Sequence, residues 1–138
     1  GMLPTLIFAP AAGSQPWAPA ALGAAAVLGH AFSPFVGFRG GKGVATAAGV
    51  LMVLAPASLA VSAGVWAALL AATGFMSLAS VLAAAALPVA IALSGPENAY
   101  TLGVAILFAG FIAFTHRANL RRLVRGTEPR MRSHGAHS

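Results

Sequence analysis

The sequence has no cysteine, only two acidic residues and little charge of any kind. Charged residues make up 7% of the 138 positions, whereas an ordinary soluble domain is about a quarter charged. Without cysteine there are no disulfides and no thiol chemistry. Glu97 and Glu128 form no carboxylate pair, which disfavours two-carboxylate acid–base catalysis and carboxylate metal sites. The four histidines have no metal-cage spacing, so we expect neither a metal nor a cofactor.

In place of charge the chain has long apolar runs. No Asp, Glu, Lys or Arg occurs in residues 1–38, 43–96 or 98–115. Such runs are typical of helices that cross a bilayer, and abundant Ala and Gly let such helices pack closely. A soluble alanine-rich bundle would need polar helix faces, which these runs lack. The predicted fold class is all-α, a polytopic transmembrane helix bundle forming a single domain over residues 1–138.

Turn signals divide the apolar runs into about five crossings, preceded by a short helix stub at the N-terminus. The stub covers residues 3–12, and three spans are expected at 19–35, 76–93 and 100–114. Between them, residues 44–72 are apolar throughout, with Pro56 near the middle. This segment is either a single kinked helix or a hairpin of short arms that turns at residues 55–58.

The basic residues predict which side of the membrane each loop occupies. Six of the eight lie between Arg117 and Arg132, so the basic tail, residues 117–138, should be cytoplasmic. The other two, Arg39 and Lys42, should lie on the same side, and so should the turn at 73–75. An even number of crossings must then separate the loop at 39–42 from the turn at 73–75, which favours the hairpin. This placement indicates topology and contact with anionic lipid rather than binding of nucleic acid.

The segment at residues 29–46, GHAFSPFVGFRGGKGVAT, has the composition of a phosphate site. Arg39 and Lys42 lie among glycines, whose backbone N–H groups can approach an anion closely. A helix beginning near Val44 would direct its N-terminus at the same anion. The segment is not a P-loop, because Val36 and Gly43 occupy positions where that motif needs Gly and Ser or Thr. A flexible basic loop that only sets topology remains the alternative.

Two further segments carry polar groups at the predicted cytoplasmic boundary. In FTHRANLRRLVRGTE, residues 114–128, His116 and Asn119 are three apart and share a helix face, which favours a function. The arginines that follow are interpreted as a stop-transfer cluster: Arg121, Arg122 and Arg125. In SLAS, Ser77 and Ser80 open a helix one turn apart, and capping or bonding to backbone carbonyls is the structural alternative.

Together these segments resemble the signatures of the bacterial acyl-phosphate:glycerol-3-phosphate acyltransferases. Residues 29–46 resemble the family's central signature, residues 116–128 its C-terminal signature and SLAS its Ser-Leu-x-Ser element, while LPT near the start resembles its second helix. The resemblance implies a multi-pass enzyme of the cell inner membrane with a cytoplasmic C-terminus. It would transfer an acyl chain from acyl phosphate to the 1-hydroxyl of glycerol 3-phosphate, giving lysophosphatidic acid for phospholipid biosynthesis.

The resemblance also assigns roles to residues. The catalytic residues it implies are Lys42, His116 and Asn119. The substrate- and phosphate-binding residues it implies are His30, Gly40, Gly41, Gly43, Thr46, Ser77 and Ser80. The proton acceptor is either His116, the titratable neutral group, or a substrate phosphate. The expected partners are acyl phosphate, glycerol 3-phosphate and membrane lipid, with no nucleic acid, and the oligomeric state is left open with a monomer as the simplest case.

The sequence departs from the family pattern in two places. The family's first helix and its Ser-Gly-Asn-x-Gly-Ala-Thr-Asn loop have no counterpart, and Gly74 occupies a position where members usually have Arg. We therefore expect a fragment or shortened reading frame that inserts in membranes but has little activity alone. The alternatives are a small anion transporter or channel subunit and an inactive inserted fragment. A transporter site is expected near the bilayer midplane, whereas His116 and Asn119 lie at the boundary.

Overall fold

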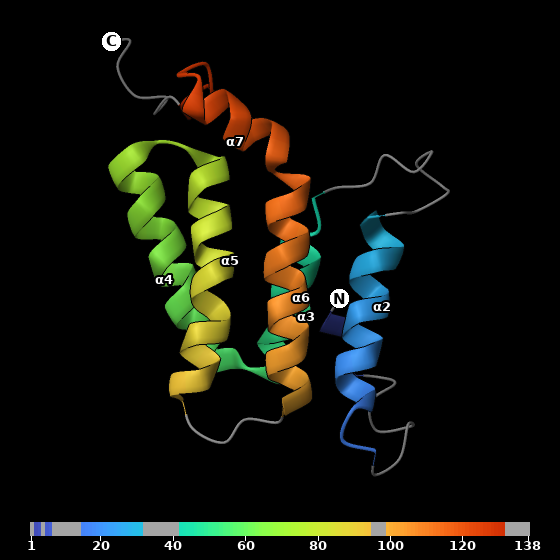
Figure 1. The fold of residues 1–138 in the computed structure, drawn as a ribbon. Coiled ribbons are helices and arrows are strands. Elements are labelled where there is room, and N and C mark those ends of the chain that lie inside the picture. Colours follow the sequence, from blue (N-terminus) through green and yellow to red (C-terminus); the bar gives the residue numbers. More distant parts are fainter. Residues whose placement is uncertain (1, 4, 7–14, 32–41, 95–98, 132–138) are drawn as a thin grey trace, which may run out of the picture.

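The structure is a computed structural model that describes residues 2–3, 5–6, 15–31, 42–94 and 99–131. All regular structure in these ranges is helical, which confirms the predicted fold class. The labelled helices, in chain order (Figure 1), are α2 (Ala18–Ala31), α3 (Val44–Leu54), α4 (Pro56–Thr73), α5 (Met76–Leu93), α6 (Ala99–Thr115) and α7 (Arg117–Val124).

The segment at 44–72 is a hairpin and not a single kinked helix. Ala55 alone separates α3 from α4, with a backbone φ of −151° and ψ of 66° that no helix contains. Pro56 is then the first residue of α4, where a missing N–H costs nothing. The chain turns back at Ala55, at the lower end of the bundle in Figure 1. The first arm is short, 11 residues, but the prediction of two short arms is wrong for α4, which has 18.

The segments predicted to share one side of the membrane lie at one end of the bundle. The start of α3, the turn between α4 and α5, and α7 are all at the upper end in Figure 1, which we call the α7 end. The turn between α3 and α4 and the end of α5 lie at the opposite end. The turn at 73–75 is where predicted, because Gly74 ends α4 in the left-handed conformation with φ of 73°.

Helix lengths support a multi-pass membrane protein. Among the described residues α4 and α5 are each long and apolar enough to cross a membrane, and α6 with α7, bent by 58°, forms a third candidate span. At 1.5 Å per residue α3 is only about 16 Å long, and α2 has 14 residues. The number of five crossings, which needs α2 and α3, stays a prediction.

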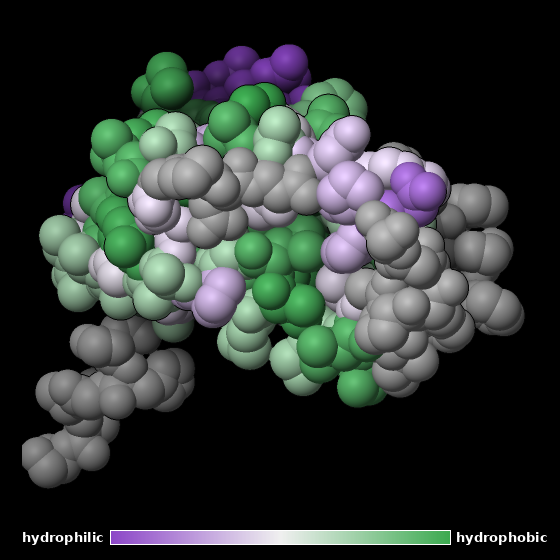
Figure 2. All heavy atoms as spheres, turned by 90° about the horizontal axis from the view of Figure 1, so that it is seen from below, coloured by the Kyte–Doolittle hydropathy of each residue, from purple (hydrophilic) through white to green (hydrophobic). Residues whose placement is uncertain are grey.

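The helices pack through both small and large apolar residues, and they also present large apolar side chains outward. Ala79 and Ala105 are fully buried between α5 and its neighbours, whereas Leu93 and Leu107 are 82% and 66% exposed. Apolar side chains are also prominent on the described part of the end opposite α7 (Figure 2). Small residues buried between helices, together with large apolar side chains exposed on their outer faces, are expected of helices packed in lipid.

Candidate functional site

The start of α3 positions Lys42 at the α7 end. Gly43 caps the helix in the left-handed conformation with φ of 77°. A Cβ atom added to Gly43 would lie 3.0 Å from Phe111 Cε1 and 3.4 Å from Val27 Cγ1. Glycine is therefore required here for both conformation and space. The Thr115 hydroxyl donates to the Lys42 carbonyl at 3.4 Å, so the start of α3 contacts the end of α6, and the Lys42 side chain extends beyond it, exposed.

His116 lies at the bend between α6 and α7. Its side chain is buried, with 3% of the residue exposed, and Nδ1 is 2.8 Å from the Ile112 carbonyl oxygen. Since a carbonyl oxygen can only accept, Nδ1 carries the hydrogen, and Nε2 is then the acceptor of a neutral ring. The bend of 58° at this residue turns α7 away from the direction of α6.

A glycine turn after α7 brings the chain back toward that helix. Gly126 has φ of 69°. Its N–H donates to the Leu123 carbonyl at 3.0 Å, and the Thr127 N–H donates to the Arg122 carbonyl at 2.8 Å. These two bonds form a Schellman motif, whose left-handed residue is usually glycine. The turn places Glu128 beside the helix that it has just left.

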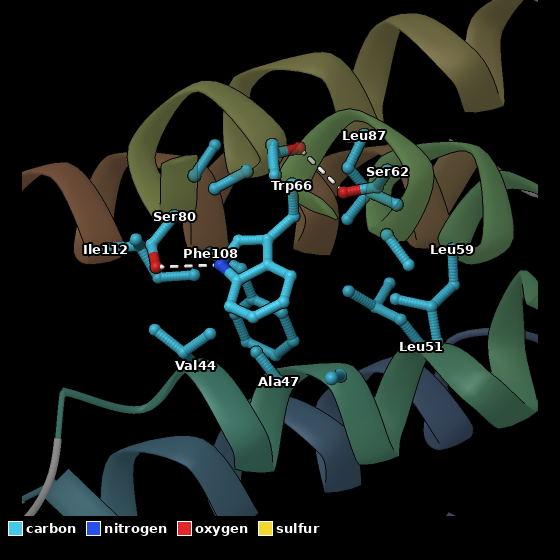
Figure 3. A pocket seen from close by; sticks show the side chains of 15 residues that line it. Val44, Ala47, Leu51, Leu59, Ser62, Trp66, Ser80, Leu87, Phe108 and Ile112 are labelled. Carbon is cyan, nitrogen blue, oxygen red and sulfur yellow. Dashed lines mark hydrogen bonds between the residues drawn. The ribbon is translucent and has the colours of Figure 1, made fainter. Parts of the chain in front are cut away.

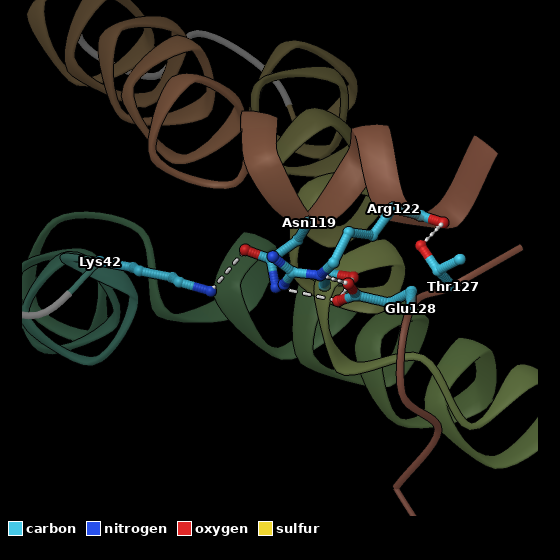
Figure 4. A network of polar contacts seen from close by, with 6 residues as sticks. Lys42, Asn119, Arg122, Thr127 and Glu128 are labelled. Carbon is cyan, nitrogen blue, oxygen red and sulfur yellow. Dashed lines mark hydrogen bonds and ion pairs between the residues drawn. The ribbon is translucent and has the colours of Figure 1, made fainter. Parts of the chain in front are cut away.

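Five side chains from four parts of the chain meet at the α7 end. The Lys42 ammonium donates to Asn119 Oδ1 at 2.8 Å. Asn119 Nδ2 and the Ser77 hydroxyl each donate to Glu128 Oε1 at 2.9 Å. Arg122 Nε donates to Glu128 Oε2 at 2.8 Å as an ion pair. We call Lys42, Ser77, Asn119, Arg122 and Glu128 the polar cluster (Figure 4).

The chemistry of the partners fixes the orientation of the Asn119 amide. Lys42 can only donate and the Glu128 carboxylate can only accept. The amide oxygen must therefore face the lysine and the amide nitrogen the carboxylate, as the distances have it. With two cations and one anion, the polar cluster has a net charge of +1, and Lys42 uses one of three N–H donors on Asn119. The cluster is suited to an anionic ligand.

Glu128 is held in its charged form. Hydrogen bonds from Asn119, the largest effect, and from Ser77 and Arg122 lower the pKa of the Glu128 carboxyl below its usual value of 4.5, although burial opposes them. Its side chain is only 5% exposed. A charged Glu128 can then orient both Asn119 and Arg122.

The predicted site residues divide into four groups. Lys42, Ser77 and Asn119 meet in the polar cluster. The structure places four others near the α7 end of their helices: Gly43 before α3, Thr46 in its first turn, His116 before α7, and Ser80 one turn beyond Ser77. His30 is exposed in the last turn of α2, and none of the described contacts joins it to the cluster. Gly40 and Gly41 lie outside the described residues.

Sequence reasoning missed two members of the cluster. Arg122 was assigned to a stop-transfer cluster, and Glu128 was given no role as a site residue. Arg121 and Arg125 are exposed, in keeping with that assignment for them. The signal that could have identified Glu128 was Gly126, since a glycine after a short helix predicts a reversal of the chain.

An apolar pocket of about 230 Å³ lies between α3, α4, α5 and α6 (Figure 3). It begins directly beside the α7-end groups. Ser80, one turn from Ser77, lines it, and so does Ile112, whose carbonyl accepts the hydrogen bond of His116. Trp66 Nε1 donates to Ser80 Oγ at 3.3 Å inside the pocket. A cationic cluster next to an apolar pocket suits a ligand with an anionic head and an apolar tail.

Fold and site thus define a class, the multi-pass helical membrane proteins with an anion-binding end beside a pocket between helices. The chain belongs to the glycerol-3-phosphate acyltransferase family, whose model matches residues 1–126.

Individual members of the family are similar in sequence to this chain. Over 133 residues the chain is 38% identical to a glycerol-3-phosphate acyltransferase of Geobacter sulfurreducens, covering 96% of this chain and 68% of the relative. A second relative, from Desulforudis audaxviator, is 46% identical over 112 residues, covering 78% of this chain and 54% of the relative. The chain therefore spans between about half and two thirds of the length of these proteins.

A solved structure has the same fold. The crystal structure of PlsY, an integral membrane glycerol 3-phosphate acyltransferase, in its glycerol 3-phosphate form matches with a TM-score of 0.87 and 36% identity. The match covers 94% of this chain and 64% of that one. PlsY in a lysophosphatidic acid form matches with a TM-score of 0.86.

Proposed function

We propose that this chain carries the site at which an acyl group passes from acyl phosphate to the 1-hydroxyl of glycerol 3-phosphate, giving lysophosphatidic acid. The observation that carries the proposal is the polar cluster of net positive charge directly beside the apolar pocket. The likeness to PlsY in its glycerol 3-phosphate and lysophosphatidic acid forms supports it. The setting is the inner membrane of a bacterium, with the C-terminus in the cytoplasm and the product used for phospholipids.

A substrate phosphate binds at Lys42 and the start of α3. Two of the three Lys42 donors remain after the bond to Asn119. The first amides of α3 have no partner within the helix, and the helix dipole favours an anion there. Thr46 lies in this first turn, and the glycines Gly40 and Gly41, which precede it in sequence, would add further amides. His30, exposed in the last turn of α2, is a further predicted binding residue.

The reaction needs positioning more than activation, because acyl phosphate is a mixed anhydride. The 1-hydroxyl oxygen forms a bond to the acyl carbon, and the bond from that carbon to the phosphate oxygen breaks. Lys42 stabilises the charge on the departing phosphate. The hydroxyl proton ends on that phosphate, either directly or by way of His116 Nε2, the acceptor nitrogen of that ring. The acyl chain lies in the apolar pocket, with Ser80 near its carbonyl end.

The position of the site argues against the alternative of an anion transporter. A transporter binds its ion near the middle of the membrane, commonly at broken helices. The break at Ala55 lies at the end of the bundle opposite α7, and the described cations gather at the α7 end. A site at one end is suited to a soluble substrate that meets a membrane-embedded one.

The test is formation of lysophosphatidic acid from hexadecanoyl phosphate and labelled glycerol 3-phosphate in proteoliposomes. The chain is assayed alone and after co-expression with the N-terminal part of the Geobacter relative, since we expect little activity alone. Lys42→Ala should lower the rate by on the order of 100-fold through lost charge stabilisation. The matched control is Arg121→Ala, an exposed cation outside the cluster. No product under either condition, or equal rates for Lys42→Ala and the control, would refute the proposal.

A further inference from the structure

The pocket is divided by one large side chain. Trp66 extends from α4 into its middle, and the residues around it fall into two groups (Figure 3). On the side nearer the polar cluster lie Val44, Ser80 and Ile112. On the far side lie three leucines, Leu51, Leu59 and Leu87. The indole therefore stands between a part of the pocket beside the polar cluster and a part lined by leucine.

One hydrogen bond between α4 and α5 holds the indole in this position, and a second joins the same two helices nearby. Trp66 Nε1 donates to Ser80 Oγ at 3.3 Å, which satisfies the one polar atom of the ring. Ser62, one turn earlier on α4, donates to the Ala83 carbonyl at 2.7 Å. The two helices are thus fixed to each other on both sides of the pocket's middle. Moving the indole aside would cost the ring its only donor contact in an apolar site.

We infer that Trp66 is a specificity-determining residue, whose indole, held across the pocket by Ser80, sets how much of an acyl chain the pocket encloses. This inference rests on the proposed function, because it takes the pocket as the acyl-chain site. Burying one more methylene is worth about fourfold in affinity. Affinity should rise with chain length until the chain reaches the indole and then level off. Without the indole the leucine-lined part becomes continuous with the rest, and longer chains gain further.

The first experiment locates the chain without needing turnover. The protein has two tryptophans, and Trp17 is 49% exposed, so Trp17→Phe leaves Trp66 as the only indole. Acyl phosphates brominated at successive carbons are added in the absence of glycerol 3-phosphate, and quenching of Trp66 fluorescence is recorded. We expect saturable quenching that peaks at one bromine position and is competed away by unlabelled hexadecanoyl phosphate. If no position quenches saturably, the inference is overturned.

The second experiment compares KM for octanoyl and hexadecanoyl phosphate. Trp66→Ala should shift the ratio of the two KM values toward the longer chain by about tenfold, which is less than two methylenes' worth. Trp66→Phe keeps an aromatic ring but loses the bond to Ser80, so its KM ratio should lie between those of the wild type and Trp66→Ala. If Trp66→Ala does not fold, the ratio for Trp66→Phe tests the inference. The control is Val61→Ala on the same helix, whose side chain is exposed outside the pocket. An unchanged ratio in both Trp66 variants would contradict the inference.

The two experiments separate this inference from the proposed function. Quenching of Trp66 with no lysophosphatidic acid formed by any preparation would leave the chain-binding role standing and refute the acyl transfer. Product formation without saturable quenching would leave the acyl transfer standing and refute the chain-binding role of Trp66.

Discussion

The polar cluster and the apolar pocket lie next to each other but are held by different kinds of contact. The cluster depends on single hydrogen bonds between residues far apart in sequence, 77 positions for Lys42 and Asn119 and 51 for Ser77 and Glu128. The pocket depends on the packing of four helices and on many interchangeable apolar atoms. A single substitution in the cluster should therefore abolish most of the activity. A substitution in the pocket should instead change the preferred length of the acyl chain gradually.

The largest effect should come from changing Asn119, the residue that connects Lys42 to Glu128 within the cluster. Asn119→Ala removes bonds to Lys42 and Glu128, each charge-assisted and worth about 1.5–3 kcal/mol, so kcat/KM should fall by on the order of 100-fold or more. Asn119→Asp should be worse, although it is nearly isosteric, because it places an oxygen against the Glu128 carboxylate. Steady-state kinetics with glycerol 3-phosphate as the varied substrate measures both.

The order of these two variants is the informative result. A better-performing Asn119→Asp would mean that the Nδ2 bond to Glu128 does not matter. The control is Arg121→Ala, an exposed cation outside the cluster, which should keep kcat/KM close to that of the wild type.

A smaller effect is expected from shifting the start of α3 without touching any cluster side chain. Gly43→Ala adds a Cβ at φ of 77° and 3.0 Å from Phe111. The left-handed conformation alone costs about 1–2 kcal/mol, so thermal stability in detergent should fall and KM for glycerol 3-phosphate should rise by about tenfold. Gly64→Ala in α4, where a Cβ meets nothing within 4 Å, is the control and should retain both values. Equal behaviour of the two variants would mean that α3 need not start at this place.

The smallest effect is a difference in stability that is present at neutral pH and lost in acid. Because the pKa of Glu128 is lowered from 4.5 in the folded protein, its charged form stabilises the fold above the unfolded pKa, and this contribution is lost as pH falls through the folded value. The melting temperatures of the wild type and Glu128→Gln should therefore differ at neutral pH and converge as pH falls through the folded pKa of Glu128, which lies below 4.5. Glu97→Gln, a change at the other acid, should follow the wild type. A constant difference at every pH would show that Glu128 acts by shape and not by charge.

Most of the helices could be predicted from the sequence because their signals are local. The span at 76–93 was predicted with the bounds that α5 has, and the span at 100–114 differs from α6 by one residue at each end. Pro56 and Gly74 mark the ends of α4 because each has a backbone preference that operates without any partner. The length of α4 was misjudged because proline was placed at a turn of several residues, whereas Ala55 alone makes the turn.

The candidate site was predicted only where a motif marks it. Lys42, Asn119 and Ser77 carry recognisable patterns, but nothing local distinguishes Arg122 from Arg121, and only the return of the chain at Gly126 selects the former. Trp66 is one apolar residue in an apolar helix, and its place across the pocket follows from the packing of α4 against α5. A turn of the chain decides the first case and the packing of two helices the second, and hydrophobic periodicity carries no information about either.

In the proposed function the polar cluster and the pocket form one site, with the phosphate at Lys42 and the chain between the helices. Photolabelling with an acyl phosphate that carries a diazirine at the chain end tests it most directly, with peptide mapping of the labelled protein. With the indole in place we expect label on Trp66 and on pocket residues of the near side such as Val44 and Ile112, and loss of that label in Lys42→Ala. Label confined to outward residues such as Val89 and Leu107, or pocket label unchanged in Lys42→Ala, would contradict it.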